Sequence, residues 1–236
     1  MKMTKTIKIL GMVLCLMISI GGLQAKGFTG SIFFDVGFPQ GEFNDVLGRG
    51  GIGLTLSLTK QISKSPIHLG LDLNFLNYGN ETTYEDIVMM PGLPLEVVTS
   101  NNIFQMMGFL RFQPLMKGSV QPYFDALVGF NYLWTATHLQ DEWDEEIASD
   151  VNYDDYSLSY GIGTGMMIRL INKNSSKSKT NPFEMFLDMR VRYIFGGQAE
   201  YLKRGSITLE YDEIVYQVYE SRTDLLTFMV GLTFSL

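Results

Sequence analysis

The last strand-like segment of this chain alternates in polarity as far as its final residue. One parity is apolar and holds Phe228, Val230, Leu232, Phe234 and Leu236, whereas the other holds Met229, Gly231, Thr233 and Ser235. Successive side chains of a strand point to opposite faces, so this pattern predicts one apolar face and one face that is mostly small or polar. A strand that is apolar outside and polar inside is what a transmembrane β-barrel requires.

The N-terminal segment has the order of a secretory signal peptide. Lysines come first, an apolar run follows over 9–20, and small residues within 21–25 offer a cleavage site after Ala25. The alternative is a membrane anchor, but the run is shorter than the roughly 20 residues that a spanning helix needs. We therefore expect a cleaved signal peptide over 1–25 and an outer membrane β-barrel domain over 26–236.

Composition narrows the functions open to the mature chain. Cys15 is the only cysteine and lies within the expected signal peptide, so neither a disulfide nor a thiolate metal site is expected. Loss of Lys2, Lys5 and Lys8 with that peptide takes the formal net charge from -7 to -10. An acidic exported chain is a poor candidate for binding nucleic acid.

Eight stretches of the chain read as strands with an apolar and a polar parity. They cover residues 27–38, 50–60, 67–78, 101–113, 121–137, 153–170, 183–195 and roughly 221–236. Period-two alternation of this kind favours half-buried strands over helices. On the sixth stretch Gly161, Gly163 and Gly165 share one parity, which indicates a face where bulk must be avoided.

The connections between these stretches alternate in length. Polar segments cover 61–66, 114–120 and 171–182, and generally longer ones cover 39–49, 79–100, 138–152 and 196–220. The segment 171–182 departs from this alternation, because it is about as long as 39–49. Short turns on one side and long loops on the other are typical of an all-β, eight-stranded antiparallel up-and-down transmembrane β-barrel. The last long loop contains two strand-like runs, 206–211 and 214–219, which predict a hairpin and leave a count of ten strands open.

Strands of membrane barrels and of soluble barrels both alternate between apolar and polar residues. The residues of the polar parity therefore have to decide between the two classes. The polar parity carries charges that we expect to pair inside a narrow lumen: Asp35, Asp72, Asp125, Asp188, Arg111, Arg169, Arg190 and Arg192, with Glu184 nearby. Leu, Ile, Phe and Met crowd the other parity and suit a lipid-facing surface. An alternative interpretation is that Arg111, Arg169 and Glu184 lie at the wet ends of the barrel.

The export signal, the eight alternating stretches and the final segment together resemble the small outer membrane β-barrel proteins of the OmpA/OmpX type. The resemblance implies residence in the outer membrane of a Gram-negative bacterium, among outer membrane lipids and lipopolysaccharide. It also implies insertion by the outer membrane assembly machinery, which recognises the last strand. In this chain that insertion signal falls on Phe228, Val230, Leu232, Phe234 and Leu236.

A search for catalytic or metal-binding patterns yields little. Only His68 and His138 are available, and neither has the neighbours of a catalytic or metal-binding histidine. The acidic residues within 141–155 fit no defined calcium loop, so a solvated loop is favoured over a cation site. The apolar segment 87–95 is expected to fold onto the barrel, with contact to a protein partner as the alternative.

These observations favour a non-enzymatic barrel with a plugged polar lumen and no catalytic residues, cofactor or metal. Its function would lie in extracellular loops, in membrane organisation, adhesion or binding of a protein partner. The main alternative is a small channel or carrier for hydrophobic solutes. A lipid-modifying barrel enzyme is the third hypothesis.

Overall fold

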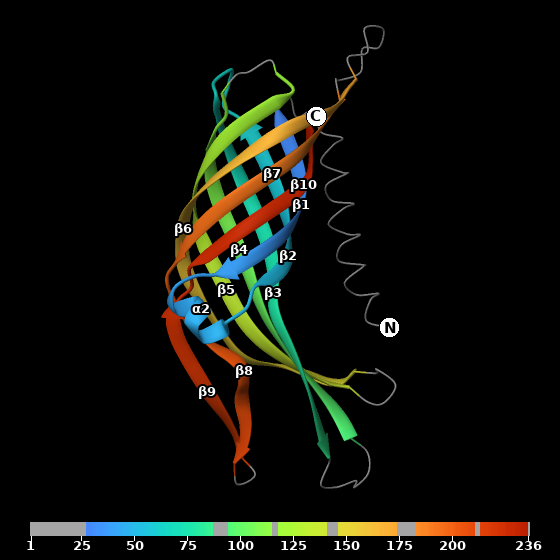
Figure 1. Cartoon of the computed structure of the whole chain (residues 1–236), viewed down its shortest axis with the longest axis vertical. Coiled ribbons are helices and arrows are strands. Elements are labelled where there is room, and N and C mark those ends of the chain that lie inside the picture. Colours follow the sequence, from blue (N-terminus) through green and yellow to red (C-terminus); the bar gives the residue numbers. More distant parts are fainter. Residues whose placement is uncertain are drawn as a thin grey trace.

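The computed structural model describes residues 27–86, 94–114, 118–140, 146–173, 183–210 and 213–235, and consists almost entirely of long antiparallel strands (Figure 1). Its elements are β1 (Phe28–Pro39), α2 (Glu42–Leu47), β2 (Gly51–Gln61), β3 (Ile67–Asp86), β4 (Pro94–Phe112), β5 (Val120–Gln140), β6 (Glu146–Lys173), β7 (Phe183–Gly196), β8 (Gln198–Glu210), β9 (Glu213–Arg222) and β10 (Leu225–Ser235).

Eight of these strands close into a barrel in the order β1-β10-β7-β6-β5-β4-β3-β2. Closure is made by β1, which pairs with β2 on one side and with β10 on the other, so that Phe34 is level with both Leu54 and Val230. The other two strands, β8 and β9, form a separate hairpin inserted between β7 and β10. The eight-stranded fold class is therefore confirmed, and the expected hairpin does not join the barrel.

The two ends of the barrel differ in structure. At one end, called here the hairpin end, lie α2, the β8–β9 hairpin and the extended tips of β3–β4 and β5–β6 (Figure 1). At the other, called the turn end, β2 connects to β3, β4 to β5 and β6 to β7. This difference places all the elaborated structure of the described residues at one end of the barrel.

Some strand boundaries differ from the sequence-based expectation. The last barrel strand begins at Leu225 rather than near Ser221, because Ser221 and Arg222 belong to β9. Much of 79–100 and 138–152 is strand rather than loop, since β3 pairs with β4, and β5 with β6, beyond the barrel wall. Antiparallel neighbours satisfy each other's backbone hydrogen bonds, so such a ribbon can continue after the barrel itself has ended.

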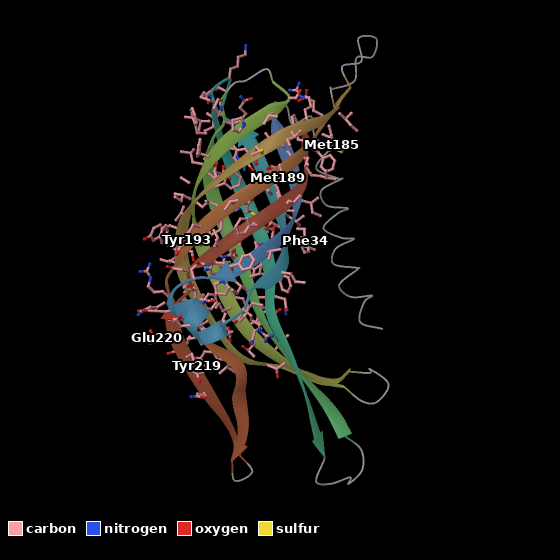
Figure 2. The ribbon with its side chains drawn as sticks, viewed as in Figure 1. Phe34, Met185, Met189, Tyr193, Tyr219 and Glu220 are labelled. Atoms are coloured by element: carbon pink, nitrogen blue, oxygen red, sulfur yellow. The ribbon has the colours of Figure 1, made fainter. Side chains whose placement is uncertain are left out.

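The outer wall of the barrel is apolar. Phe34 is 54% exposed, Val128 68% and Leu158 79%, which are exposures that water would penalise and lipid would not. Figure 2 labels Phe34, Met189 and Tyr193 on the strands of this wall. The predicted polarity, with apolar residues outside, is therefore confirmed.

Aromatic rings gather on the outer wall towards the hairpin end. Tyr132 and Trp134 on β5 lie with their ring centroids 5.3 Å apart, and Phe75 on β3 is 5.7 Å from Trp134. Such aromatic clusters are typical of the rim of the apolar band in membrane barrels. Among the described residues, no helix is long and apolar enough to cross a membrane.

Candidate functional site

The interior of the barrel contains a compact layer of charged side chains. Seven of the eight charges predicted for the lumen are at most 5% exposed: Asp35, Asp72, Asp125, Asp188, Arg111, Arg190 and Arg192. The eighth, Arg169, stays at the turn end, where its Nε is 3.8 Å from Glu184 and both side chains are partly exposed. Arg169 and Glu184 thus lie at a wet end of the barrel, as in the alternative interpretation, whereas Arg111 is buried, with an exposure of 2%.

The charged layer is held together by several ion pairs. Arg111 donates two hydrogen bonds to Asp125, of 2.7 and 2.9 Å. Arg192 lies between two acids, with one nitrogen against Asp72 and another 3.3 Å from Asp125. Arg190 donates a 3.0 Å hydrogen bond to Asp188, on its own strand. Because Arg190 Nη1 also lies 3.9 Å from Asp72, one connected set contains three acids and three arginines: Asp72, Asp125, Asp188, Arg111, Arg190 and Arg192. Burial in a low-dielectric interior requires charges to be paired in this way.

Asp35 is bound differently from the other three acids. Its Oδ2 accepts hydrogen bonds from Thr55 and Asn74, on the two strands that follow β1. Within the described part of the chain, no ion pair to Asp35 shorter than 4.0 Å is present, and its Oδ1 has no hydrogen-bond partner. Asp35 is therefore held by neutral donors, whereas Asp72, Asp125 and Asp188 face guanidinium groups.

Aromatic rings fill the spaces between the buried arginines. The Arg111 guanidinium carbon lies 3.6 Å from the centroid of the Tyr123 ring, and that of Arg190 lies 3.8 Å from the Phe33 ring. Tyr123 also donates a hydrogen bond to Asp188. Lumen-facing glycines make room for these rings, because a Cβ on Gly165 would lie 2.4 Å from Tyr123. The expected function of the β6 glycines, to avoid bulk in the lumen, is confirmed at this position.

Between the charged layer and the hairpin end, an apolar layer occupies much of the lumen, beside buried polar side chains such as Gln105, which donates a hydrogen bond to Asn131. The layer contains Leu76, Ile103, Met107, Phe109, Leu127, Leu133, Ile194 and Leu225, each less than 5% exposed. Phe109 marks the boundary, since the guanidinium carbons of Arg111 and Arg192 lie 5.2 and 5.5 Å from its ring. The polar lumen expected from the sequence therefore also contains large apolar side chains in this part of the barrel. The sequence does contain a sign of this layer, because apolar residues such as Phe109 and Leu127 occupy the inward parity of the fourth and fifth stretches.

The first connection closes the barrel above this apolar layer. Helix α2 lies across the hairpin end (Figure 1), and its Phe43 is completely buried. The Phe43 ring contacts Tyr201 of β8 and Tyr78 of β3, with centroid distances of 5.2 and 6.0 Å. Nothing in the sequence pattern had singled out Phe43, because a lone aromatic residue in a loop has no period to reveal it.

The turn end contains a polar cavity of about 220 Å³. Its lining includes Thr59, His68, Arg111, Gln113 and Glu184. His68 and Arg111 are register partners across β3 and β4, and Arg111 separates the cavity from the Asp125 carboxylate. The cavity is therefore a polar entrance that ends at the charged layer.

Other residues considered from the sequence contribute no site that the structure describes. The segment 87–93 and residues 141–145 lie outside the described residues, as does the expected signal peptide, and nothing is described of the His138 side chain. In the described ranges there is no group of three or more His, Cys, Asp or Glu side chains that could hold a metal ion. His68 therefore belongs to no such group.

The final strand carries most of the expected insertion signal on the outer wall. Phe228, Val230 and Leu232 are 45%, 51% and 37% exposed, and Phe234 is partly exposed on the same face. Leu236 lies outside the described residues. Recognition of this strand by the assembly machinery remains a prediction.

The structure resembles several solved outer membrane proteins at low sequence identity. Neisserial surface protein A has a TM-score of 0.41 and 12% identity, over 89% of this chain and 98% of that one. The attachment invasion locus protein of Yersinia pestis, Ail, in complex with sucrose octasulfate, has a TM-score of 0.43 and 13% identity over the same shares. A major outer membrane protein from Thermus thermophilus has a TM-score of 0.42 and 11% identity, over 87% and 98%. No family model and no curated protein matches this chain.

The topology and the distribution of polarity agree on one architecture. A closed antiparallel eight-stranded barrel, with an apolar outer wall and buried charges within, is the design of a small outer membrane barrel. In this barrel both a charged layer and an apolar layer fill the interior, and a short helix covers one end.

Proposed function

We propose that this outer membrane barrel is a non-enzymatic protein that acts through the structure at its hairpin end. We orient that end towards the cell exterior, with the short turns in the periplasm, as in other small barrels. The hairpin end would then present the β8–β9 hairpin and the tips of the β3–β4 and β5–β6 ribbons to the surroundings. Its tasks would be membrane organisation, adhesion or the binding of a protein partner.

The filled lumen is the observation that carries this proposal. Arg190 is 2% exposed in the charged layer, and Leu76 and Phe43 are fully buried nearer the hairpin end. Eight strands leave an interior just wide enough for side chains, and here large side chains occupy it. Among the described residues, side chains packed in this way leave little room for an aqueous path, so the activity is best sought outside the lumen.

Two measurements on the folded protein test the proposal. In a planar bilayer, the intact barrel is expected to show no stepwise conductance. On whole cells, replacing residues 203–216 of the β8–β9 hairpin by a short turn should abolish the attachment of the cells to surfaces or to a protein partner. The replacement should leave assembly of the barrel intact. Assembly is monitored by the change in gel mobility on boiling. Regular conductance steps, or attachment that survives the replacement, would contradict the proposal.

The surroundings of the barrel follow from the same orientation. The apolar wall would contact outer membrane lipids, and the rim at the hairpin end would meet lipopolysaccharide. The outward face of β10 would be the part that the assembly machinery recognises. In a test of this recognition, Phe228, Val230 or Leu232 exchanges its position with a neighbouring polar residue of the opposite parity, so the composition stays constant. The exchange should reduce membrane assembly in cells.

A carrier for hydrophobic solutes is the second candidate. It is favoured by the apolar layer inside the barrel, which offers apolar contacts to a hydrophobic solute. Cells expressing the protein would then take up a hydrophobic solute faster than cells that lack it. A lipid-modifying activity ranks third and would appear as an altered lipid A profile on expression.

A further inference from the structure

Part of the apolar layer forms a socket around one fully buried side chain of α2. The socket is built by the barrel and the hairpin, with walls from Leu76 and Tyr78 of β3, Leu225 of β10 and Tyr201 of β8, each at most 2% exposed. Phe43 is the only fully buried side chain that α2 inserts, Val46 and Leu47 of the same helix pack against the cluster while partly buried, and Glu42, Asn44 and Asp45 are exposed. The barrel strands and β8 therefore supply the fully buried walls of the socket, and α2 covers it from outside.

Two glycines in unusual backbone conformations bound the segment that carries Phe43. It is flanked by Gly41, with φ 54° and ψ -135°, and by Gly48, with φ 65°. Backbone conformations of this kind are open to glycine and strained for most other residues. Outside the socket its hydrogen bonds to the rest of the barrel are few, among them Arg222 N to Glu42 at 3.3 Å and Gln40 N to Asp224 O at 2.9 Å.

A second feature of the socket does not match its present occupant. The Tyr78 hydroxyl is buried and has no hydrogen-bond partner among the described residues, although its ring contacts Phe43. The other tyrosine of the socket differs, since the Tyr201 hydroxyl lies 2.7 Å from Ser221 Oγ. A buried hydroxyl without a partner is costly, and a phenylalanine ring offers it no hydrogen bond.

We propose that α2 is a displaceable plug and that the socket beneath Phe43 binds a single-ring aromatic molecule with a polar substituent, of the phenol class. The ring would take the place of the Phe43 ring between Tyr78 and Tyr201. Its polar atom would pair with the Tyr78 hydroxyl, which Phe43 leaves unpaired. The proposal goes beyond the loop-borne function above and does not depend on it, because it concerns the lumen.

The test compares two probes in the folded, detergent-solubilised full-length protein. The probes are p-cresol and toluene, which have the same ring and methyl group but differ in the hydroxyl. Binding is measured by ligand-observed NMR on the wild type, on Phe43→Ala and on Asn44→Ala, which alters an exposed residue of the same helix. All samples contain the same detergent, so partition of the probe into micelles cancels.

Removing the plug side chain is expected to tighten p-cresol binding by about tenfold or more, because the probe no longer competes with a buried ring. Asn44→Ala should bind like the wild type. In the Phe43→Ala background, Tyr78→Phe should bring p-cresol down to the affinity of toluene. Equal p-cresol binding by wild type and Phe43→Ala would overturn the proposed socket, and a p-cresol preference that survives Tyr78→Phe would overturn the assigned polar partner.

A more conservative substitution keeps the proposal testable if Phe43→Ala does not fold. Phe43→Leu keeps an apolar side chain in the socket but removes the ring, and it is expected to bind p-cresol with an affinity between those of the wild type and Phe43→Ala. Folding of every variant is checked by the change in gel mobility on boiling. A folded Phe43→Leu that binds p-cresol no better than Asn44→Ala would contradict the proposal independently.

Discussion

Arg111 and Asp125 face each other across β4 and β5, and the guanidinium reaches the carboxylate with two hydrogen bonds of 2.7 and 2.9 Å. The pair lies directly behind the polar cavity at the turn end and contacts the rest of the charged layer through Arg192. Its two hydrogen bonds make it a bidentate ion pair, and its contribution to the free energy of unfolding can be measured.

Removing the carboxylate of this pair should be strongly destabilising. Asp125→Ala leaves Arg111 and Arg192 buried with one acid fewer, and breaking a buried pair costs about 3–5 kcal/mol. The measurement is urea unfolding of the barrel in lipid vesicles. Arg169→Gln is the matched control, because the Arg169–Glu184 pair is partly exposed and is expected to contribute less than about 1 kcal/mol.

Asp35→Asn should be tolerated far better than Asp125→Asn. The Asp35 carboxylate accepts hydrogen bonds from neutral Thr55 and Asn74, so an amide oxygen can replace it without stranding a cation. We expect a loss of about 1 kcal/mol in the free energy of unfolding, the size of an ordinary hydrogen-bond change. Equal losses for the two substitutions would show that Asp35 is part of the ion-pair set after all.

A methyl group on Gly165 should damage the packing of the lumen. A Cβ there would lie 2.4 Å from Tyr123, which is itself held by Asp188 and Arg111, so the ring cannot easily retreat. Overpacking of this kind costs about 1–3 kcal/mol. Gly108→Ala is the control, since the nearest atom to its Cβ would be 3.6 Å away; a loss at Gly108 as large as at Gly165 would refute the explanation.

A charge on the outer wall tests the polarity of the whole barrel. Phe34 lies near the middle of β1 and is 54% exposed, so Phe34→Arg would place a guanidinium against lipid. The expected cost is about 2–4 kcal/mol near the bilayer midplane. Unfolding in vesicles measures it, with Phe34→Leu as the apolar control. An arginine variant as stable as the leucine variant would mean that this face does not contact lipid.

Much of the barrel was predictable because one face of each strand contacts lipid and the other faces the lumen. Phe34, Leu54 and Val230 alternate with Asp35, Gly53 and Met229, and the pleat then sets which residues face lipid. The charged residues of the lumen could be identified for the same reason, since a charge on a lipid-facing parity would be penalised strongly. The pattern therefore indicated both the fold class and the inward position of Asp72, Asp125 and Arg190.

The tertiary structure alone decided how the interior is filled. Alternation says that Phe109 and Leu127 differ in parity from their neighbours, but only the closed barrel shows that they meet Leu76 and Ile194 in one apolar layer. Phe43 could not have been predicted, because its burial depends on a loop reaching walls contributed by β3, β8 and β10. Local sequence determines which face a strand side chain occupies; contacts between distant segments determine what that side chain packs against, because they exist only after the barrel has closed.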